Sequence, residues 1–205
     1  MESVPLVFGE PIYAAGEAIK QIYFPESGII SLLSEVDKDS TLEVGIVGSE
    51  GLTGVSVFLG VGTSPNRAVV QGAGTARTMS PRSFLAACRS SEKLSQTVRR
   101  FIHSLLTQIS QSAVCNRYHL IDDRLSRWLL MTHDRMRSDE FEITQDFLSN
   151  MLGVRREAVN KAAGDLQRRG LISYKRGHLT VIYRAGLEAA ACPCYKLIRQ
   201  QYDSA

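Results

Sequence analysis

The pattern of apolar and polar positions changes its period along the chain and divides it into three parts. Over residues 1–80, short apolar or alternating runs follow one another, separated by Gly, Pro, Asp and Ser. Close, regular spacing of this kind predicts the short strands of a barrel or jelly roll. The strands are expected at residues 11–13, 18–24, 28–36, 42–47, 67–71 and 76–79, followed by a short helix at 81–88.

The second part has a helical period. Residues 92–118 contain neither Pro nor Gly, and their apolar residues approximate the heptad pattern of a dimer interface. The expected interface residues are Leu94, Val98, Phe101, Leu105 and Ile109. Ile102, Leu106, Ala113 and Val114 widen the apolar surface, so the helix could pack on its own barrel and on a second copy at once. A helix buried within one chain is the alternative. A further helix is expected over 120–136, then a polar connector with a small strand at 137–142.

The third part, residues 144–182, predicts a helix, a tight turn, a second helix and a hairpin. Thr144 is suited to capping the first helix, and Gly153 permits the turn. In the second helix, from about 155 to 168, Ala158, Val159, Ala162, Ala163 and Leu166 fall on one side. Arg156, Glu157, Asn160, Lys161, Gln167 and Arg168 fall on the other.

A helix that presents Arg, Glu, Asn and Lys outward has the donors and acceptors needed to read base edges in the DNA major groove. The hairpin over 171–182 has two β-rich runs around Arg176-Gly177-His178 and carries positive charge at its tip. The expected DNA contacts are Thr144, Gln145, Arg155, Arg156, Glu157, Asn160, Lys161, Arg176 and His178. The alternatives are a helix pair that only packs and a cationic face that is merely solvated.

Charge is distributed unevenly along the 205 residues. The net charge of +3 divides into −3 over residues 1–90, 0 over 91–154 and +6 over 155–205. The positive charge therefore collects on the second helix and the hairpin, as expected for a polyanion partner.

The four cysteines are Cys88, Cys115, Cys192 and Cys194. Cys88 and Cys115 are interpreted as buried small hydrophobic residues, and Cys192-Pro-Cys194 is too closely spaced for a CxxC redox site or a zinc knuckle. None of His103, His119, His133 and His178 stands in a recognisable ligand motif, so no metal site is predicted. A four-cysteine metal cluster remains a minor alternative.

Other classes of protein find no support in the sequence. The apolar runs are shorter than a membrane span, and the N-terminus lacks a signal-peptide pattern, so a cytoplasmic location without a membrane partner is expected. No GxSxG, P-loop, HExxH or paired-carboxylate arrangement occurs, and an enzyme is not expected.

The layout as a whole resembles the Crp/Fnr superfamily of bacterial transcription regulators. The resemblance is carried mainly by Ile143-Thr-Gln-Asp-Phe-Leu-Ser-Asn-Met-Leu-Gly-Val-Arg-Arg-Glu-Ala-Val-Asn-Lys-Ala162 and by Leu166-Gln-Arg-Arg-Gly-Leu-Ile172. Tyr23-Phe-Pro-Glu-Ser-Gly28, Val47-Gly-Ser-Glu-Gly51 and Arg124-Leu-Ser-Arg-Trp-Leu-Leu-Met-Thr-His133 also resemble a subgroup of this family. The Arg-Glu pair and later basic residue of the family's recognition helix correspond to Arg156, Glu157 and Lys161.

The resemblance implies an α+β fold with three parts. These are an N-terminal double-stranded β-helix (jelly roll) sensor at 1–90, a dimerisation helix and hinge helix at 91–136, and a winged helix–turn–helix at 137–205. It implies double-stranded DNA, a second copy of the chain and RNA polymerase as partners. The competing hypothesis is a small-molecule-binding module whose winged helix binds a protein.

The resemblance is weakest at the effector pocket. Cyclic-AMP-binding members carry a Gly-Glu and an Arg-Ser, and the corresponding positions here are Gly54-Val55 and Arg67-Ala68. The arginine is retained, but the glutamate for the ribose hydroxyl and the serine are not. Cyclic nucleotide binding is therefore not expected, and a different small anion near Arg67, or no effector, is the prediction.

Overall fold

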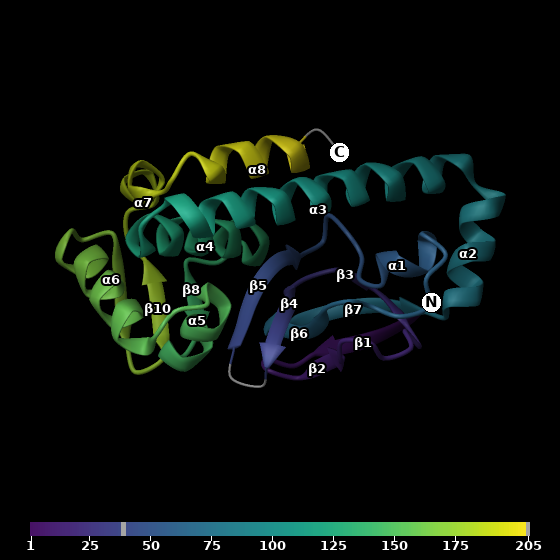
Figure 1. Cartoon of the computed structure of the whole chain (residues 1–205), viewed down its shortest axis with the longest axis horizontal. Coiled ribbons are helices and arrows are strands. Elements are labelled where there is room, and N and C mark those ends of the chain that lie inside the picture. Colours follow the sequence, from purple (N-terminus) through teal and green to yellow (C-terminus); the bar gives the residue numbers. More distant parts are fainter. Residues whose placement is uncertain (38–39, 204–205) are drawn as a thin grey trace.

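The N-terminal part of the computed structural model, which describes residues 1–37 and 40–203, is a jelly roll of two antiparallel sheets (Figure 1). The first sheet has the order β1-β7-β3 and the second the order β2-β6-β4-β5. The strands are β1 (Glu2–Leu6), β2 (Pro11–Tyr13), β3 (Ile22–Pro25), β4 (Ile29–Asp37), β5 (Ser40–Val47), β6 (Arg67–Gly72) and β7 (Gly74–Met79). The α+β fold class and the jelly roll expected from the sequence are confirmed.

The jelly roll includes one short helix between two strands, and two further helices follow its last strand. They are the short α1 (Val55–Phe58) between β5 and β6, α2 (Pro81–Ser90) and α3 (Glu92–Tyr118). Ser91 caps α3 by accepting a hydrogen bond from the Leu94 amide. The helix then runs the length of the jelly roll and reaches the C-terminal part of the chain (Figure 1).

The C-terminal part is a winged helix–turn–helix. It contains α4 (Ile121–Met136), β8 (Glu140–Glu142), α5 (Gln145–Leu152), α6 (Arg156–Arg168), β9 (Ile172–Lys175), β10 (His178–Val181), α7 (Arg184–Ala190) and α8 (Cys194–Asp203). Strands β8, β10 and β9 form an antiparallel sheet in that order. Helix α8 returns along α3, where the Ser104 hydroxyl donates to the Gln201 carbonyl over 3.2 Å (Figure 1).

Helix α4 packs with the winged helix. Leu125, Trp128 and Leu129 of α4 share a buried cluster with Leu148 of α5 and Leu166 of α6. The sequence interpretation grouped this helix with α3, whereas the packing groups it with the C-terminal part. The same cluster includes Ile29, Leu33, Ile46 and Val69 of the β2-β6-β4-β5 sheet, so the core is continuous between the two parts.

Several elements were not expected from the sequence. Strand β1 contains Pro5, which disfavours a strand, but β1 lies at a sheet edge, where fewer backbone amides need a partner. Helices α1, α7 and α8 were also missed. Among the described residues, no helix is long and apolar enough to cross a membrane.

Candidate nucleic-acid interface, sensor cavity and cysteine cluster

Helices α5 and α6 form a tight helix–turn–helix. The Thr144 hydroxyl caps α5 by accepting a 3.1 Å hydrogen bond from the Phe147 amide. Gly153 ends α5 with a φ of +59°, in the left-handed region that glycine adopts without strain. The Val154 amide then donates to the Ser149 carbonyl over 3.0 Å, which satisfies one carbonyl of the last turn.

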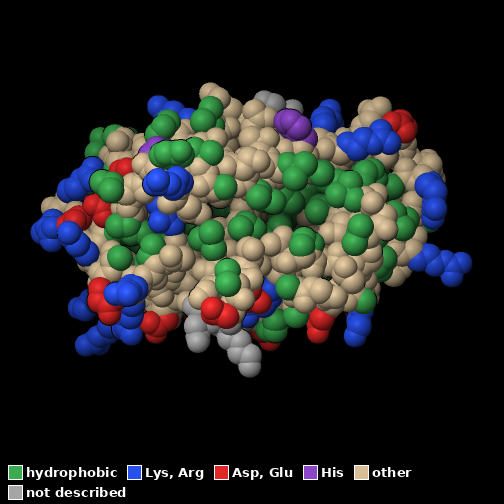
Figure 2. Space-filling view, viewed as in Figure 1, with side chains coloured by type: hydrophobic (Ala, Val, Ile, Leu, Met, Phe, Trp, Pro, Cys, Tyr) green, Lys and Arg blue, Asp and Glu red, His purple; other side chains and the backbone are tan. Residues whose placement is uncertain are grey.

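The two faces of α6 separate as the sequence predicted. Val159, Ala162, Ala163 and Leu166 are buried in the core of the C-terminal part. Arg155, Arg156, Glu157, Asn160, Lys161, Gln167 and Arg168 are exposed. Figure 2 shows lysine and arginine side chains, interspersed with acidic ones, gathered at the end of the molecule formed by α6. A rigid helix therefore presents a polar, cationic face to solvent.

Arg156 is oriented by the first helix of the pair. Its Nε donates to the Gln145 side-chain oxygen over 3.2 Å, and its Nη1 lies 3.3 Å from an Asp146 carboxylate oxygen. These exposed contacts are weak in water. They extend the guanidinium across the N-terminus of α5, so that Gln145 and Arg156, both expected DNA contacts, present one hydrogen-bonding surface.

The wing is a two-residue hairpin with unusual backbone geometry. Arg176 and Gly177 both have positive φ, +52° and +83°, as the mirror-image type I′ turn requires. Asn-Gly is the preferred pair in such a turn, and an arginine at its first position is strained. The Ile143 amide donates to the Gly177 carbonyl over 2.7 Å, so the turn lies beside the start of α5. His178 is exposed at the start of β10.

Replacing Arg176 by asparagine is expected to weaken DNA binding without lowering the stability of the protein. Asparagine tolerates the positive φ, so the melting temperature should be unchanged or raised. Loss of a phosphate-contacting cation should weaken binding to all DNA sequences alike and reduce the salt slope of log K by about one. Thermal melts and DNA titrations at several salt concentrations check both effects. An unchanged salt slope would remove Arg176 from the interface.

The residues expected at the dimer interface are mostly directed inward. Val98, Phe101 and Leu105 are 1%, 3% and 3% exposed and lie in the hydrophobic core of the jelly roll. Leu94 and Ile109 are partly buried against the same cluster. The sequence assignment was therefore wrong for the three buried residues, because the larger apolar side chains of α3 are covered by the chain's own sheets.

A different stripe of α3 faces solvent. Its members recur at alternating spacings of four and three residues and are all exposed: Arg99, His103, Leu106, Ser110, Ala113 and Arg117. Leu106 is 58% exposed and Val114 46%, and Leu59 and Val61, which follow α1, are similarly exposed. Figure 2 shows apolar side chains gathered over the middle of α3 and the neighbouring part of the jelly roll. This stripe has the heptad spacing of a helix–helix contact, with small residues that permit close approach.

A cavity of about 170 Å³ lies between the jelly roll and α3. Its lining includes Tyr13, Thr53 and Asn66 as polar groups, together with Gly54 and Val55, and contains no charged side chain. Ile102, Leu105, Leu106 and Ile109 of α3 close it. Burial raises the pKa of Tyr13, whose hydroxyl contacts Ser64 and Thr53. The cavity is smaller than the roughly 300–1,000 Å³ of typical small-molecule sites.

Two of the four expected effector-pocket residues lie outside this cavity. The Arg67 guanidinium forms a 2.8 Å ion pair with Glu35, and Ala68 is fully buried in β6. Neither belongs to the cavity lining. An anion at Arg67 stays a prediction, and it would have to compete with the carboxylate partner that the arginine already has within the chain.

A buried polar network connects the jelly roll to α4. The Ser31 hydroxyl lies 2.7 Å from both the Glu43 carboxylate and the Gln71 side-chain oxygen. The Gln71 amide nitrogen donates to the Thr132 hydroxyl over 2.8 Å. Burial raises the pKa of Glu43 to about 7. Sequence analysis missed this network, since nothing in the alternation of a strand marks one glutamate as inward-facing.

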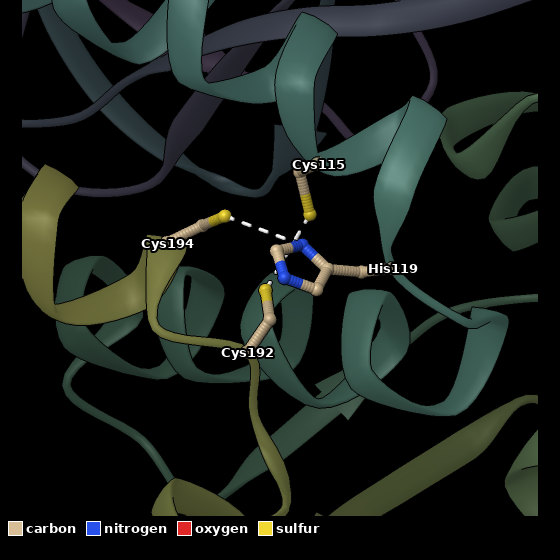
Figure 3. Close-up of side chains that lie close together, drawn as sticks. All are labelled: Cys115, His119, Cys192 and Cys194. Atoms are coloured by element: carbon tan, nitrogen blue, oxygen red, sulfur yellow. Dashed lines mark hydrogen bonds between the residues drawn. The ribbon is translucent and has the colours of Figure 1, made fainter.

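The structure brings together side chains that the sequence interpretation kept apart. Cys115 and His119, at the end of α3, meet Cys192 and Cys194, at the start of α8 (Figure 3). The four potential ligand atoms all lie within 4.8 Å of one another, and the three cysteines are buried. Cys88 is buried elsewhere, in the jelly-roll core. The burial expected of Cys88 and Cys115 is thus confirmed, but Cys115 belongs to a cluster.

Comparison with known proteins agrees with this geometry. The model of the Crp-like helix-turn-helix domain matches residues 123–190, which extend from α4 through the wing to α7. No relative among curated proteins matches the chain.

Solved structures show a similar fold over almost the whole chain. A CRP-family transcriptional regulator of Thermus thermophilus is 20% identical, with 92% of this chain and 96% of that chain covered and a TM-score of 0.74. FixK2 of Bradyrhizobium japonicum is 13% identical, with 93% and 97% covered and a TM-score of 0.73. A putative crp/fnr-family regulator of Eubacterium rectale is 14% identical, with 92% and 88% covered and a TM-score of 0.73.

Residues 123–190 thus contain a Crp-like helix–turn–helix domain, and the chain as a whole has the fold of these regulators: a jelly roll joined by a long helix to a winged helix–turn–helix.

Proposed function

We propose that the protein is a homodimeric regulator that reads a pseudo-palindromic DNA site through α6 and the Arg176 wing. The exposed polar face of α6, opposite a fully apolar face, is the observation that carries this proposal. A single recognition helix reads only a few base pairs, so a dyad-related pair reading half-sites about one helical turn apart supplies the specificity. RNA polymerase stays a predicted partner on the family resemblance alone.

Selection of bound genomic fragments, followed by gel shifts, tests this function. The expected result is a set of fragments that share an inverted repeat and outcompete random DNA. Fragments bound without any shared motif would contradict sequence-specific binding. If the winged helix bound other proteins and no DNA, the result would favour the competing hypothesis, a small-molecule-binding module whose winged helix binds a protein.

Arg156→Ala is expected to weaken binding to the selected site by about 1–3 kcal/mol and to relax preference at one base pair. The substitution removes a guanidinium that can donate to a guanine edge from the exposed face of α6. Titrations against the selected site and its single-base variants measure both effects. Arg89→Ala removes an exposed arginine from α2 and should change neither. Equal affinity of Arg156→Ala and the parent protein for the selected site would contradict base readout by this helix.

Cyclic AMP and cyclic GMP are expected to bind no tighter than the high-micromolar range. The cavity offers no cation to a buried phosphate, and Val55 cannot accept a hydrogen bond from a ribose hydroxyl. A missing charge-assisted partner costs about 1.5–3 kcal/mol, or roughly ten- to a hundredfold in affinity. Isothermal titration calorimetry with each nucleotide checks this, and a submicromolar dissociation constant would refute it.

A further inference from the structure

The cysteine cluster has the geometry of a mononuclear metal site. Cys115 and His119 are four residues apart and therefore lie on one face at the end of α3. Cys192 and Cys194 flank Pro193, and the chain turns there, with the Tyr195 amide donating to the Cys192 carbonyl over 3.1 Å. Figure 3 shows the four side chains pointing toward one another from these two segments.

Two of the separations between ligand atoms are close to those of a tetrahedral zinc site. The sulfurs of Cys115 and Cys192 are 3.4 Å apart, and the Cys194 sulfur is 3.5 Å from His119 Nδ1. A zinc ion with Zn–S bonds of about 2.3 Å and Zn–N bonds of about 2.0 Å separates its ligands by roughly 3.5–3.8 Å. An iron–sulfur cluster places several iron and sulfide ions between its ligands and would need them farther apart.

The charges around the cluster complement such a site. Arg124 and Arg127 are buried, and both interact electrostatically with Cys115. Among residues 1–37 and 40–203, neither forms an ion pair with an acidic side chain, and the Nε of each is buried without a hydrogen-bond partner. Three thiolates and one neutral imidazole around Zn²⁺ carry a net charge of −1, which offsets buried positive charge.

The surroundings also orient a ligand. The Gln111 side-chain nitrogen lies 3.0 Å from the Cys194 sulfur and donates to it. Hydrogen bonds of this kind fix ligand orientation in metal sites. The cluster joins α3 to the first residue of α8, so an ion there would hold these two helices together at the end of α3, beside the start of α4.

We propose that Cys115, His119, Cys192 and Cys194 bind one Zn²⁺ ion that fastens α8 to α3. On binding, the three thiol groups release their protons to solvent, the neutral imidazole contributes a nitrogen lone pair, and no electron is transferred. The proposal does not depend on DNA binding, and it differs from the sequence prediction that no metal is bound.

Elemental analysis of the untagged, purified chain tests the site. About one zinc per chain is expected for a closed four-ligand site, with loss of the zinc in Cys194→Ser. Cys88→Ser removes a buried cysteine outside the cluster and should retain the metal. Iron with labile sulfide, or a Cys115–Cys192 disulfide seen as a reductant-sensitive mass change, would overturn the proposal. So would equal zinc in Cys194→Ser and the parent protein.

A second measurement is independent of how well the variant folds. Adding Co²⁺ to the metal-stripped parent chain should give thiolate-to-cobalt charge transfer and the strong visible bands of tetrahedral coordination. Hydrogen exchange should show faster exchange of the α8 amides after zinc is stripped, and recovery on adding Zn²⁺ alone. The weak visible bands of octahedral Co²⁺ would contradict the site. So would an exchange rate of the α8 amides that is the same with and without zinc.

Discussion

Leu106→Glu is expected to convert the protein to monomers and to weaken its binding to a full DNA site at least a hundredfold. Leu106 is the largest apolar residue of the α3 stripe and is 58% exposed, so two copies related by a dyad would place two carboxylates in one apolar contact. Each monomer then reads a single half-site. Sedimentation and titration of full and half sites measure the two effects. Leu105 is unsuitable for this test, because it lies in the chain's own core.

The control for this experiment is Val7→Glu. Val7 is 47% exposed and directly follows β1 in the sequence. Strand β1 lies on the side of the jelly roll away from α3 (Figure 1). This variant should remain dimeric and bind DNA normally. Sedimentation of the parent protein as a monomer at micromolar concentration, or of Leu106→Glu as a stable dimer, would refute the α3 interface.

Glu43→Gln is expected to stabilise the protein at pH 8 by on the order of 3 kcal/mol, with little effect at pH 4.5. Burial raises the pKa of Glu43 from 4.5 to about 7 in the folded state. The folded chain therefore holds an extra proton between these values, so stability falls as pH rises from about 4.5 to 7, and the loss persists above. Denaturant unfolding across this range measures the difference.

Burial favours the neutral form of Glu43, although the Ser31 hydrogen bond by itself lowers the pKa, and the network can accommodate that neutral form. The single Ser31 proton cannot serve both Glu43 and Gln71, which are equally near. A protonated Glu43 donates to Ser31 and releases the serine proton for Gln71, and the glutamine amide in Glu43→Gln can do the same. The exposed Glu10→Gln should leave the pH dependence unchanged. If the free energy of unfolding changed with pH in the same way for the parent protein and Glu43→Gln, this account would be contradicted.

The sequence was most informative where one local pattern decides the structure. The bounds of α3 followed from an uninterrupted helical period, and Thr144 and Gly153 marked the two ends of α5. The faces of α6 separated cleanly because small apolar residues alternate with charged ones at helical spacing.

The sequence was misleading where one hydrophobic pattern was compatible with two ways of packing the helix. Helix α3 has apolar residues on more than one face, and periodicity cannot say which face meets the chain's own sheets. The structure buries the stripe with Phe101 and Leu105 and leaves Leu106 exposed, because the bulkier stripe covers more of the jelly roll. Helix α8 was missed although Tyr195, Ile198 and Tyr202 have helical spacing.

The cysteine cluster could not be assembled from spacing along the chain. A zinc knuckle places paired ligands in one short segment, whereas here Cys192 lies 77 positions after Cys115. Only the return of α8 along α3 brings them together. The single residue between Cys192 and Cys194 suffices, because the chain turns at Pro193 before α8 begins.

Leu106 belongs to two surfaces at once, since it lines the cavity beneath α3 and stands on the solvent-facing stripe of that helix. In the proposed dimer, a molecule that fills the cavity and shifts this side chain would change the free energy of self-association. By thermodynamic linkage the converse also holds, and association changes the affinity of the cavity by the same factor. For this protein, the concentration of the chain itself is then a variable in any measurement of an effector's affinity.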